Sequence, residues 1–116
     1  MINTAMVKAT VNLDRITVLN VIKDLHNTLK EHGIRDNQIA LFGSFFNGNV
    51  HEDSDMDIIV ISSFFEGKNL LERLDMTAKA QIEIKRKYIV PMDILLKTPQ
   101  EYDYSKTTYF NSEIII

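Results

Sequence analysis

Two short stretches of this chain, Leu41-Phe42-Gly43-Ser44 and Asp55-Met56-Asp57-Ile58-Ile59-Val60, are separated by ten residues and decide its fold. A Gly-Ser turn after an apolar strand offers backbone N–H groups and a hydroxyl to an anion. Side chains alternate along a strand, so Asp55 and Asp57 point to the same face. Two neighbouring carboxylates repel each other unless a cation joins them, and Mg²⁺ is usually held by one or two carboxylates plus substrate phosphates. The two stretches therefore predict a phosphate site and a metal site close together.

A third acid lies in the short apolar run Val90-Pro91-Met92-Asp93-Ile94-Leu95-Leu96. An aspartate inside such a strand is costly to bury without a partner. If this strand lies beside the one that carries Asp55 and Asp57, Asp93 gains a metal to bind. Asp53 and Asp55 have the same spacing as Asp55 and Asp57, but the apolar run that begins after Asp57 favours the second pair.

The order Gly-Ser, Asp-x-Asp and a later strand aspartate resembles the polymerase-β-like nucleotidyltransferase superfamily. The wording FGSFFNGNVHEDSDMDIIV is most similar to its minimal nucleotidyltransferases, and the resemblance covers about Gln38 to Leu96. It implies a nucleotidyltransferase (polymerase-β palm-like) fold of the α/β (α+β) class, in which a small mixed β-sheet packs against helices.

The resemblance also assigns roles to residues. Gly43 and Ser44 would bind the β- and γ-phosphates of a nucleoside triphosphate. Asp55, Asp57 and Asp93 would be the catalytic carboxylates and would ligate two Mg²⁺ ions, and Asp93 would also accept the proton of the attacking hydroxyl. The implied reaction transfers a nucleoside monophosphate, AMP from ATP, to an acceptor hydroxyl.

One departure from the family weakens the expected triphosphate binding. Many relatives continue Gly-Ser with Arg-x-Arg-Gly, whereas this chain has Phe45-Phe46-Asn47-Gly48. The glycine is kept and both cations are absent, so Lys97 or another cation would have to substitute. The departure also raises the prospect of a domain that has lost its activity.

Three functions stay open from the sequence. Relatives of this size often work beside a separate HEPN-domain protein, as the antitoxin of a toxin–antitoxin pair, and modify a protein hydroxyl. A non-catalytic nucleotide-binding or partner-binding module is the alternative from another class. A small-molecule nucleotidyltransferase, such as an antibiotic-modifying enzyme, usually carries an added helical domain that we do not find in residues 1–116.

The composition indicates a single soluble domain over residues 1–116. The net charge of −3 argues against a nucleic-acid binder that relies on phosphate contacts. The chain has no cysteine, no signal-peptide pattern and no apolar run long enough to span a bilayer, so we expect a cytoplasmic protein that does not bind membranes. The expected partners are a nucleotide triphosphate and either a HEPN-type protein or further copies of the chain.

Hydrophobic periodicity predicts the elements around the motif. We expect helices over 13–32 and 69–87 and a further helix that begins at Thr98-Pro99-Gln100-Glu101, with strands over 39–42, 56–61 and 89–96. The first helix should bury a stripe at Leu13, Ile16, Leu19, Ile22, Leu25 and Leu29, and Gly33 should be the C′ residue that follows it. The second helix should bury Leu71, Leu74, Ala78 and Ile82.

Other features have two interpretations each. His51 is a solvated loop residue or a ligand, and Lys85-Arg86-Lys87 is a charged helix end or a polyanion site. Three tyrosines near the C-terminus are packing residues or a docking surface: Tyr102, Tyr104 and Tyr109. The final Ile114-Ile115-Ile116 either packs on the core or contacts a partner.

Overall fold

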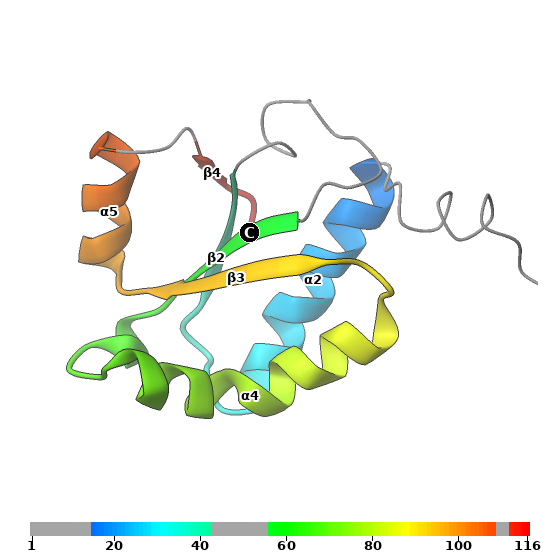
Figure 1. The fold of residues 1–116 in the computed structure, drawn as a ribbon, viewed down its shortest axis with the longest axis horizontal. Coiled ribbons are helices and arrows are strands. Elements are labelled where there is room, and N and C mark those ends of the chain that lie inside the picture. Colours follow the sequence, from blue (N-terminus) through cyan, green and yellow to red (C-terminus); the bar gives the residue numbers. More distant parts are fainter. Residues whose placement is uncertain (1–14, 43–55, 109–111) are drawn as a thin grey trace, which may run out of the picture.

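A computed structural model describes residues 15–42, 56–108 and 112–116 of the chain. These ranges form a small sheet with helices on both of its faces (Figure 1). The elements are, in chain order, α2 (Arg15–Glu31), β1 (Gln38–Phe42), β2 (Met56–Ile61), the 3₁₀ turn η1 (Ser63–Phe65), α4 (Leu70–Lys87), β3 (Met92–Lys97), α5 (Pro99–Thr108) and β4 (Ser112–Ile114).

The described sheet is mixed, with the strand order β3-β2-β1-β4. β1 runs antiparallel to both β2 and β4, whereas β2 and β3 are parallel. Parallel neighbours need a crossover connection, and α4 supplies it between β2 and β3. The predicted fold class, a small mixed sheet packed with helices, is confirmed.

Each face of the sheet has its own apolar cluster. The larger cluster lies between the sheet and the helices α2 and α4, and includes Leu25, Ile58 and Ile84. The smaller cluster lies on the opposite face, where Tyr102 of α5 packs against Ala40 and Ile59. Because both faces of β2 are covered, its near-continuous apolar sequence is explained.

The inward face of α2 agrees with the prediction only in its second half. Ile22, Leu25 and Leu29 are buried as expected, but Ile16 and Leu19 are exposed, and Val18 and Val21 take their places. Leu13 lies outside the described residues. Gly33 lies two residues beyond the end of α2 and has a positive φ of 95°, which is the left-handed conformation expected of a C′ glycine.

The predicted inward face of α4 is wrong. Leu71 is 76% exposed and Ile82 is 50% exposed, and the buried residues are Thr77, Ala80 and Ile84. The reason lies at the start of the helix, where Arg73 hydrogen-bonds to the Leu96 carbonyl oxygen on β3. Residues 77, 80 and 84 follow Arg73 at spacings of four, three and four, so this contact turns them toward the sheet.

The corrected face of α4 gives a paired prediction. Ile84→Val should lower the free energy of unfolding by about 0.5–1.5 kcal/mol, because it removes a buried methylene. Ile82→Val, two residues away in the same helix, should stay within about 0.5 kcal/mol of the wild type. Urea unfolding of both variants is the measurement, and equal losses would contradict this orientation of α4.

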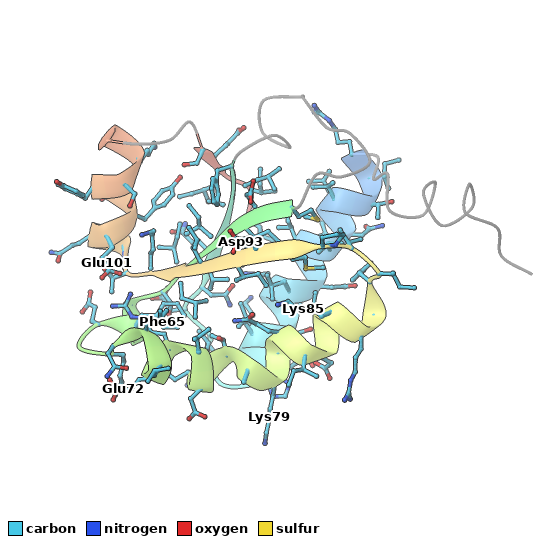
Figure 2. All side chains as sticks on the ribbon, viewed as in Figure 1. Phe65, Glu72, Lys79, Lys85, Asp93 and Glu101 are labelled. Carbon is cyan, nitrogen blue, oxygen red and sulfur yellow. The ribbon has the colours of Figure 1, made fainter. Side chains whose placement is uncertain are left out.

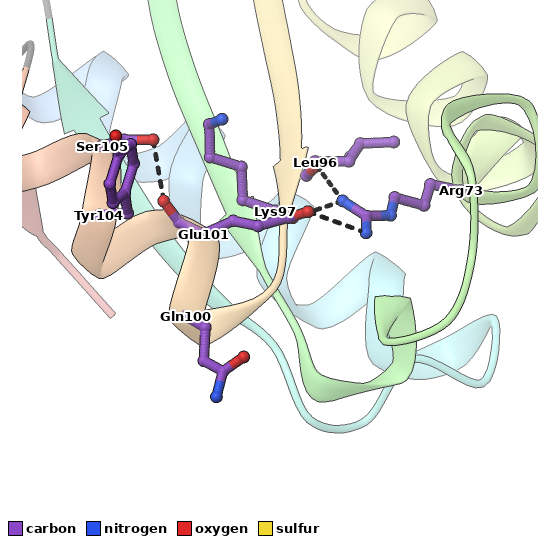
Figure 3. Close-up of a pocket in the computed structure, with 7 residues that line it drawn as sticks. All are labelled: Arg73, Leu96, Lys97, Gln100, Glu101, Tyr104 and Ser105. Carbon is purple, nitrogen blue, oxygen red and sulfur yellow. Dashed lines mark hydrogen bonds and ion pairs between the residues drawn. The ribbon is translucent and has the colours of Figure 1, made fainter.

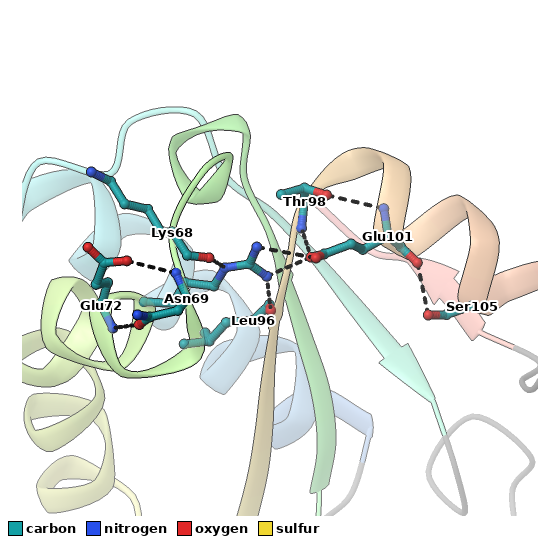
Figure 4. Close-up of polar contacts among 8 residues, drawn as sticks. Lys68, Asn69, Glu72, Leu96, Thr98, Glu101 and Ser105 are labelled. Carbon is teal, nitrogen blue, oxygen red and sulfur yellow. Dashed lines mark hydrogen bonds and ion pairs between the residues drawn. The ribbon is translucent and has the colours of Figure 1, made fainter.

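The C-terminal residues form a fourth strand that was not predicted from the sequence. Ile114 pairs with Ala40 of β1, and the backbone N–H of Ile115 donates to the Ile39 carbonyl oxygen at 2.8 Å. The final residues therefore extend the sheet, and the core-packing interpretation holds for Ile115, which packs against the larger cluster, whereas Ile114 and Ile116 are exposed. Before this strand, Thr98 and Glu101 form the capping box predicted for α5 (Figure 4).

Within the described ranges, we find no helix with the length and apolar character needed to cross a bilayer.

Candidate functional site

Two of the three predicted carboxylates lie side by side in the sheet. Asp57 of β2 and Asp93 of β3 are direct partners in the parallel register. Neighbouring strands are about 4.8 Å apart, and residues in register point to the same face. The strand assignments that bring this pair together follow from the sequence pattern alone.

The pair lies on the face of the sheet that carries α5. Asp57 shares the alternation of Ile59 and Ile61, and Asp93 shares that of Leu95, all of which belong to the smaller apolar cluster. α5 follows the carboxyl end of β3, whereas each aspartate is the second residue of its strand (Figure 2 labels Asp93). Asp57 is half-buried and Asp93 is exposed, so this end of the face is open to a ligand.

The remaining predicted site residues, Gly43, Ser44 and Asp55, lie outside the described residues, as do His51 and the pair Phe45-Phe46. The structure does describe the residue that precedes them. Phe42, the last residue of β1, is the register partner of Asp57. The Gly-Ser dipeptide therefore begins one peptide bond after a residue that is paired with the carboxylate site.

The donor set suits a hard divalent cation. Two aspartates in register offer carboxylate oxygens on one face, which is the ligand type that Mg²⁺ prefers. The described residues contain no cluster of three or more potential metal ligands. The two described aspartates would therefore bind an ion together with substrate oxygens and with any donors from the residues between β1 and β2.

The most connected polar residue of the described structure, Arg73, lies away from the carboxylates. Its guanidinium donates to both carboxylate oxygens of Glu101, at 2.6 and 3.2 Å, and to the Leu96 carbonyl oxygen (Figure 3). It also donates to the Lys68 carbonyl oxygen. The paired guanidinium holds the pKa of Glu101 below its usual value. These bonds use the donors that an anion would need, so Arg73 joins α4, β3 and α5 rather than binding a ligand.

Arg73 and Glu101 line an open hollow of about 500 Å³, and Lys97 and Tyr104 also contribute to its walls (Figure 3). Lys97 was the cation suggested to replace the missing arginines. It is four residues further along β3 than Asp93, or about 13 Å for an extended strand. Its side chain lies near Glu101, whose pKa it helps to lower, so it is poorly placed to bind phosphates at the carboxylate pair.

A second polar cluster connects α2 to the turn that precedes β3. Asp24 accepts hydrogen bonds from Lys87, at 2.8 Å, and from the Tyr88 hydroxyl. The Lys87 hydrogen bond is the largest cause that lowers the pKa of Asp24, and the Tyr88 hydroxyl adds to it. Burial and the same carboxylate raise the pKa of Tyr88 to about 12. The cluster fixes the end of α4 just before β3 begins.

Asp24 should make stability depend on pH in acid. A carboxyl group whose pKa is lower in the folded state stabilises the protein above its unfolded pKa, and this contribution disappears as the pH falls through the folded pKa. The free energy of unfolding should therefore fall below about pH 4, and Asp24→Asn should show less of this fall. Thermal melts from pH 7 down to pH 3 test this, with Asp75→Asn as the control for an exposed acid on α4. Parallel curves for the wild type and Asp24→Asn would contradict it.

Comparisons with known proteins agree with this fold. A candidate nucleotidyltransferase from Sulfolobus solfataricus, solved by crystallography, superposes with a TM-score of 0.65 at 18% identity, over 85% of this chain and 79% of that one. The crystal structure of a second candidate nucleotidyltransferase gives 0.57 at 22% identity, over 82% of this chain and 97% of that one. Identities this low establish the fold alone.

Two further comparisons add no functional information. A crystal structure of a toxin–antitoxin with AMP-PNP covers 65% of this chain at 21% identity, with a TM-score of 0.46, which is too low to support an argument. No curated protein matches the chain.

Family membership rests on the sequence comparison. The family model for the nucleotidyltransferase domain matches residues 22–115, which is well over half of the chain and includes all three predicted carboxylates. The chain therefore belongs to the nucleotidyltransferase domain family.

Proposed function

We propose that this protein is a metal-dependent nucleotidyltransferase that moves AMP from ATP to a hydroxyl of a partner protein. The observation that carries the proposal is the register of Asp57 with Asp93 on an open face of the sheet. A fold that served only to cover a partner would gain nothing from two adjacent carboxylates, because like charges in contact are destabilising.

The residues of the chain have distinct roles in this reaction. Asp57, with Asp55, holds the metal-bound triphosphate, and Gly43 and Ser44 bind its outer phosphates. Asp93 lies at the edge strand and takes the proton of the acceptor hydroxyl. The hydroxyl oxygen forms a bond to the α-phosphorus, the bond from that phosphorus to the bridging oxygen breaks, and pyrophosphate leaves. Bound Mg²⁺ would supply charge neutralisation for the entering and leaving oxygens.

The choice of a protein acceptor is supported by the resemblance to minimal nucleotidyltransferases. Asp93 is exposed and Asp57 is half-buried, so a hydroxyl of a protein acceptor can approach Asp93 from solvent. Minimal nucleotidyltransferases often pair with HEPN-domain toxins, so the antitoxin role is the specific form of the proposal. The competing function is a binding module without catalytic activity. The absence of the family's arginines after Ser44 favours this alternative.

Nucleotide binding is the first test. ATP with Mg²⁺ at about 100 times its dissociation constant should stabilise the protein by roughly 2.7 kcal/mol, visible as a higher melting temperature. Asp57→Asn should lose most of this shift, because it removes a charge that the metal requires. Asp75→Asn, an exposed acid on α4, is the matched control and should keep it. An equal shift in the wild type and Asp57→Asn would place the nucleotide elsewhere.

A further inference from the structure

The outer side of β3 is an open sheet edge that the proposed function leaves without a role. β3 is the edge strand of the described sheet. The carbonyl oxygens of Pro91 and Lys97 accept hydrogen bonds from the backbone N–H groups of Met56 and Ser62. The backbone N–H and C=O groups of the odd-numbered residues of β3 therefore point toward β2. Because backbone groups alternate in direction along a strand, the N–H and C=O groups of Met92, Ile94 and Leu96 point away from the sheet.

This edge is closed at one end and open in the middle. The Leu96 carbonyl oxygen accepts a hydrogen bond from Arg73 at 3.1 Å, which occupies the end nearest α5. The outward groups of Met92 and Ile94 have no hydrogen-bond partner among the described residues. Proteins usually shield such edges, because unpaired strand groups attract other strands. Here the unshielded part is the segment that carries Asp93.

A strand added at this edge would reach the carboxylate site. Residues directly opposite each other on paired strands have Cβ atoms about 4.5–5.5 Å apart and point to the same face. A serine, threonine or tyrosine opposite Asp93 would therefore direct its hydroxyl toward the Asp57–Asp93 face. Main-chain pairing would fix the distance between the acceptor and Asp93 without a dedicated pocket.

The surroundings of the edge indicate the chemistry of the added segment. An open hollow of about 490 Å³ lies at the start of β3, with Lys85, Ile89 and Met92 among its lining residues. Lys85 is exposed and makes no ion pair within the described part of the chain (Figure 2). Lys97 lies at the other end of the strand. A segment with apolar residues around its hydroxyl and acidic residues at its ends complements this edge.

We propose that the β3 edge from Met92 to the backbone N–H of Leu96 is the docking site of the acceptor, an extended, acidic, hydroxyl-bearing segment of a partner protein that adds as a strand. The role given to Asp93 rests on the proposed function, but docking requires no nucleotide. The two can therefore fail separately.

Amide hydrogen exchange of the full chain, measured by NMR without nucleotide, tests the docking. The probe is a synthetic peptide with alternating valine and threonine around a central tyrosine and glutamates at both ends. The control peptide has prolines at alternate positions, which removes the donors that strand pairing needs. At millimolar concentration, the first peptide should slow exchange at Ile94 by about tenfold, and the proline peptide should not. Unchanged exchange with the first peptide would overturn the proposal.

A matched pair of variants isolates the backbone contact. Ile94→Pro removes one outward N–H and no bond to β2, a position where a strand tolerates proline. Ile94→Val keeps the N–H and a similar shape. Peptide binding is measured from the NMR chemical-shift changes of the Leu96 amide. Ile94→Pro should lose peptide binding but keep the ATP-induced rise in melting temperature, whereas Ile94→Val should keep both. Equal peptide binding by the two variants would exclude pairing at this edge.

The remaining outcomes distinguish a partner segment from a second copy of the chain at the β3 edge, and the docking site from the proposed function. Slower exchange at Ile94 on raising the protein concentration alone would identify a second copy as the occupant and overturn the proposal. Docking of the peptide without AMP transfer to its tyrosine supports the docking site and counts against the proposed function. ATP binding without docking leaves the proposed function standing and removes this edge from it.

Discussion

The Asp93→Asn variant is expected to transfer AMP about 100- to 10,000-fold more slowly than the wild type, which is the usual loss when a general base is removed. Asparagine keeps the size of the side chain and one oxygen, but it cannot accept the proton of the acceptor hydroxyl. Because Asp93 is exposed on the edge strand, the substitution should leave the fold intact. Intact mass of the acceptor, measured over time with ATP and Mg²⁺, gives the rate.

The comparison with Asp57 separates the two roles. Asp57→Asn should lose both nucleotide binding and transfer, whereas Asp93→Asn should keep a larger part of the ATP-induced melting shift. Asp75→Asn should change neither quantity, since it lies on α4 beyond the other face of the sheet. A normal transfer rate in Asp93→Asn would show that another group takes the proton, even if the Asp57 site is correct.

The strands and the carboxylate pair could be predicted because strand patterns are local. An apolar run of strand length beside an aspartate predicted β2 with the same bounds that the structure shows, Met56–Ile61. β3 begins at Met92, three residues later than predicted, and keeps the proline outside the strand. Once two such strands are parallel neighbours, register alone brings Asp57 and Asp93 together.

The inward face of α4 could not be predicted, because its sequence carries two competing stripes. The leucine-rich stripe through Leu71 is the more apolar one, so hydrophobic periodicity selected it. The observed face through Thr77 is determined by tertiary contacts of Arg73 with β3 and α5, which are distant in sequence. β4 was missed for a similar reason, because three residues are too few to show alternation and only their pairing with β1 makes them a strand.

Phe65 connects the end of β2 to α4, and Phe65→Ala is expected to cause the largest loss of stability among the substitutions considered. Its ring is fully buried in the larger apolar cluster between the sheet and the two helices α2 and α4. The Arg73 guanidinium carbon lies 5.8 Å from the centre of the Phe65 ring. The Phe65 ring therefore also supports Arg73, the residue that joins α4 to β3. Truncation should lower the free energy of unfolding by about 3–5 kcal/mol.

Phe64 provides the matched control for this prediction, because it is the preceding residue in the same 3₁₀ turn. Phe64 is 41% exposed, and its backbone N–H donates to the Ser62 hydroxyl oxygen, a bond that truncation of the Phe64 side chain does not remove. Phe64→Ala should therefore cost clearly less than Phe65→Ala in urea unfolding. Similar costs would mean that the turn itself, rather than the burial of one ring, stabilises this connection.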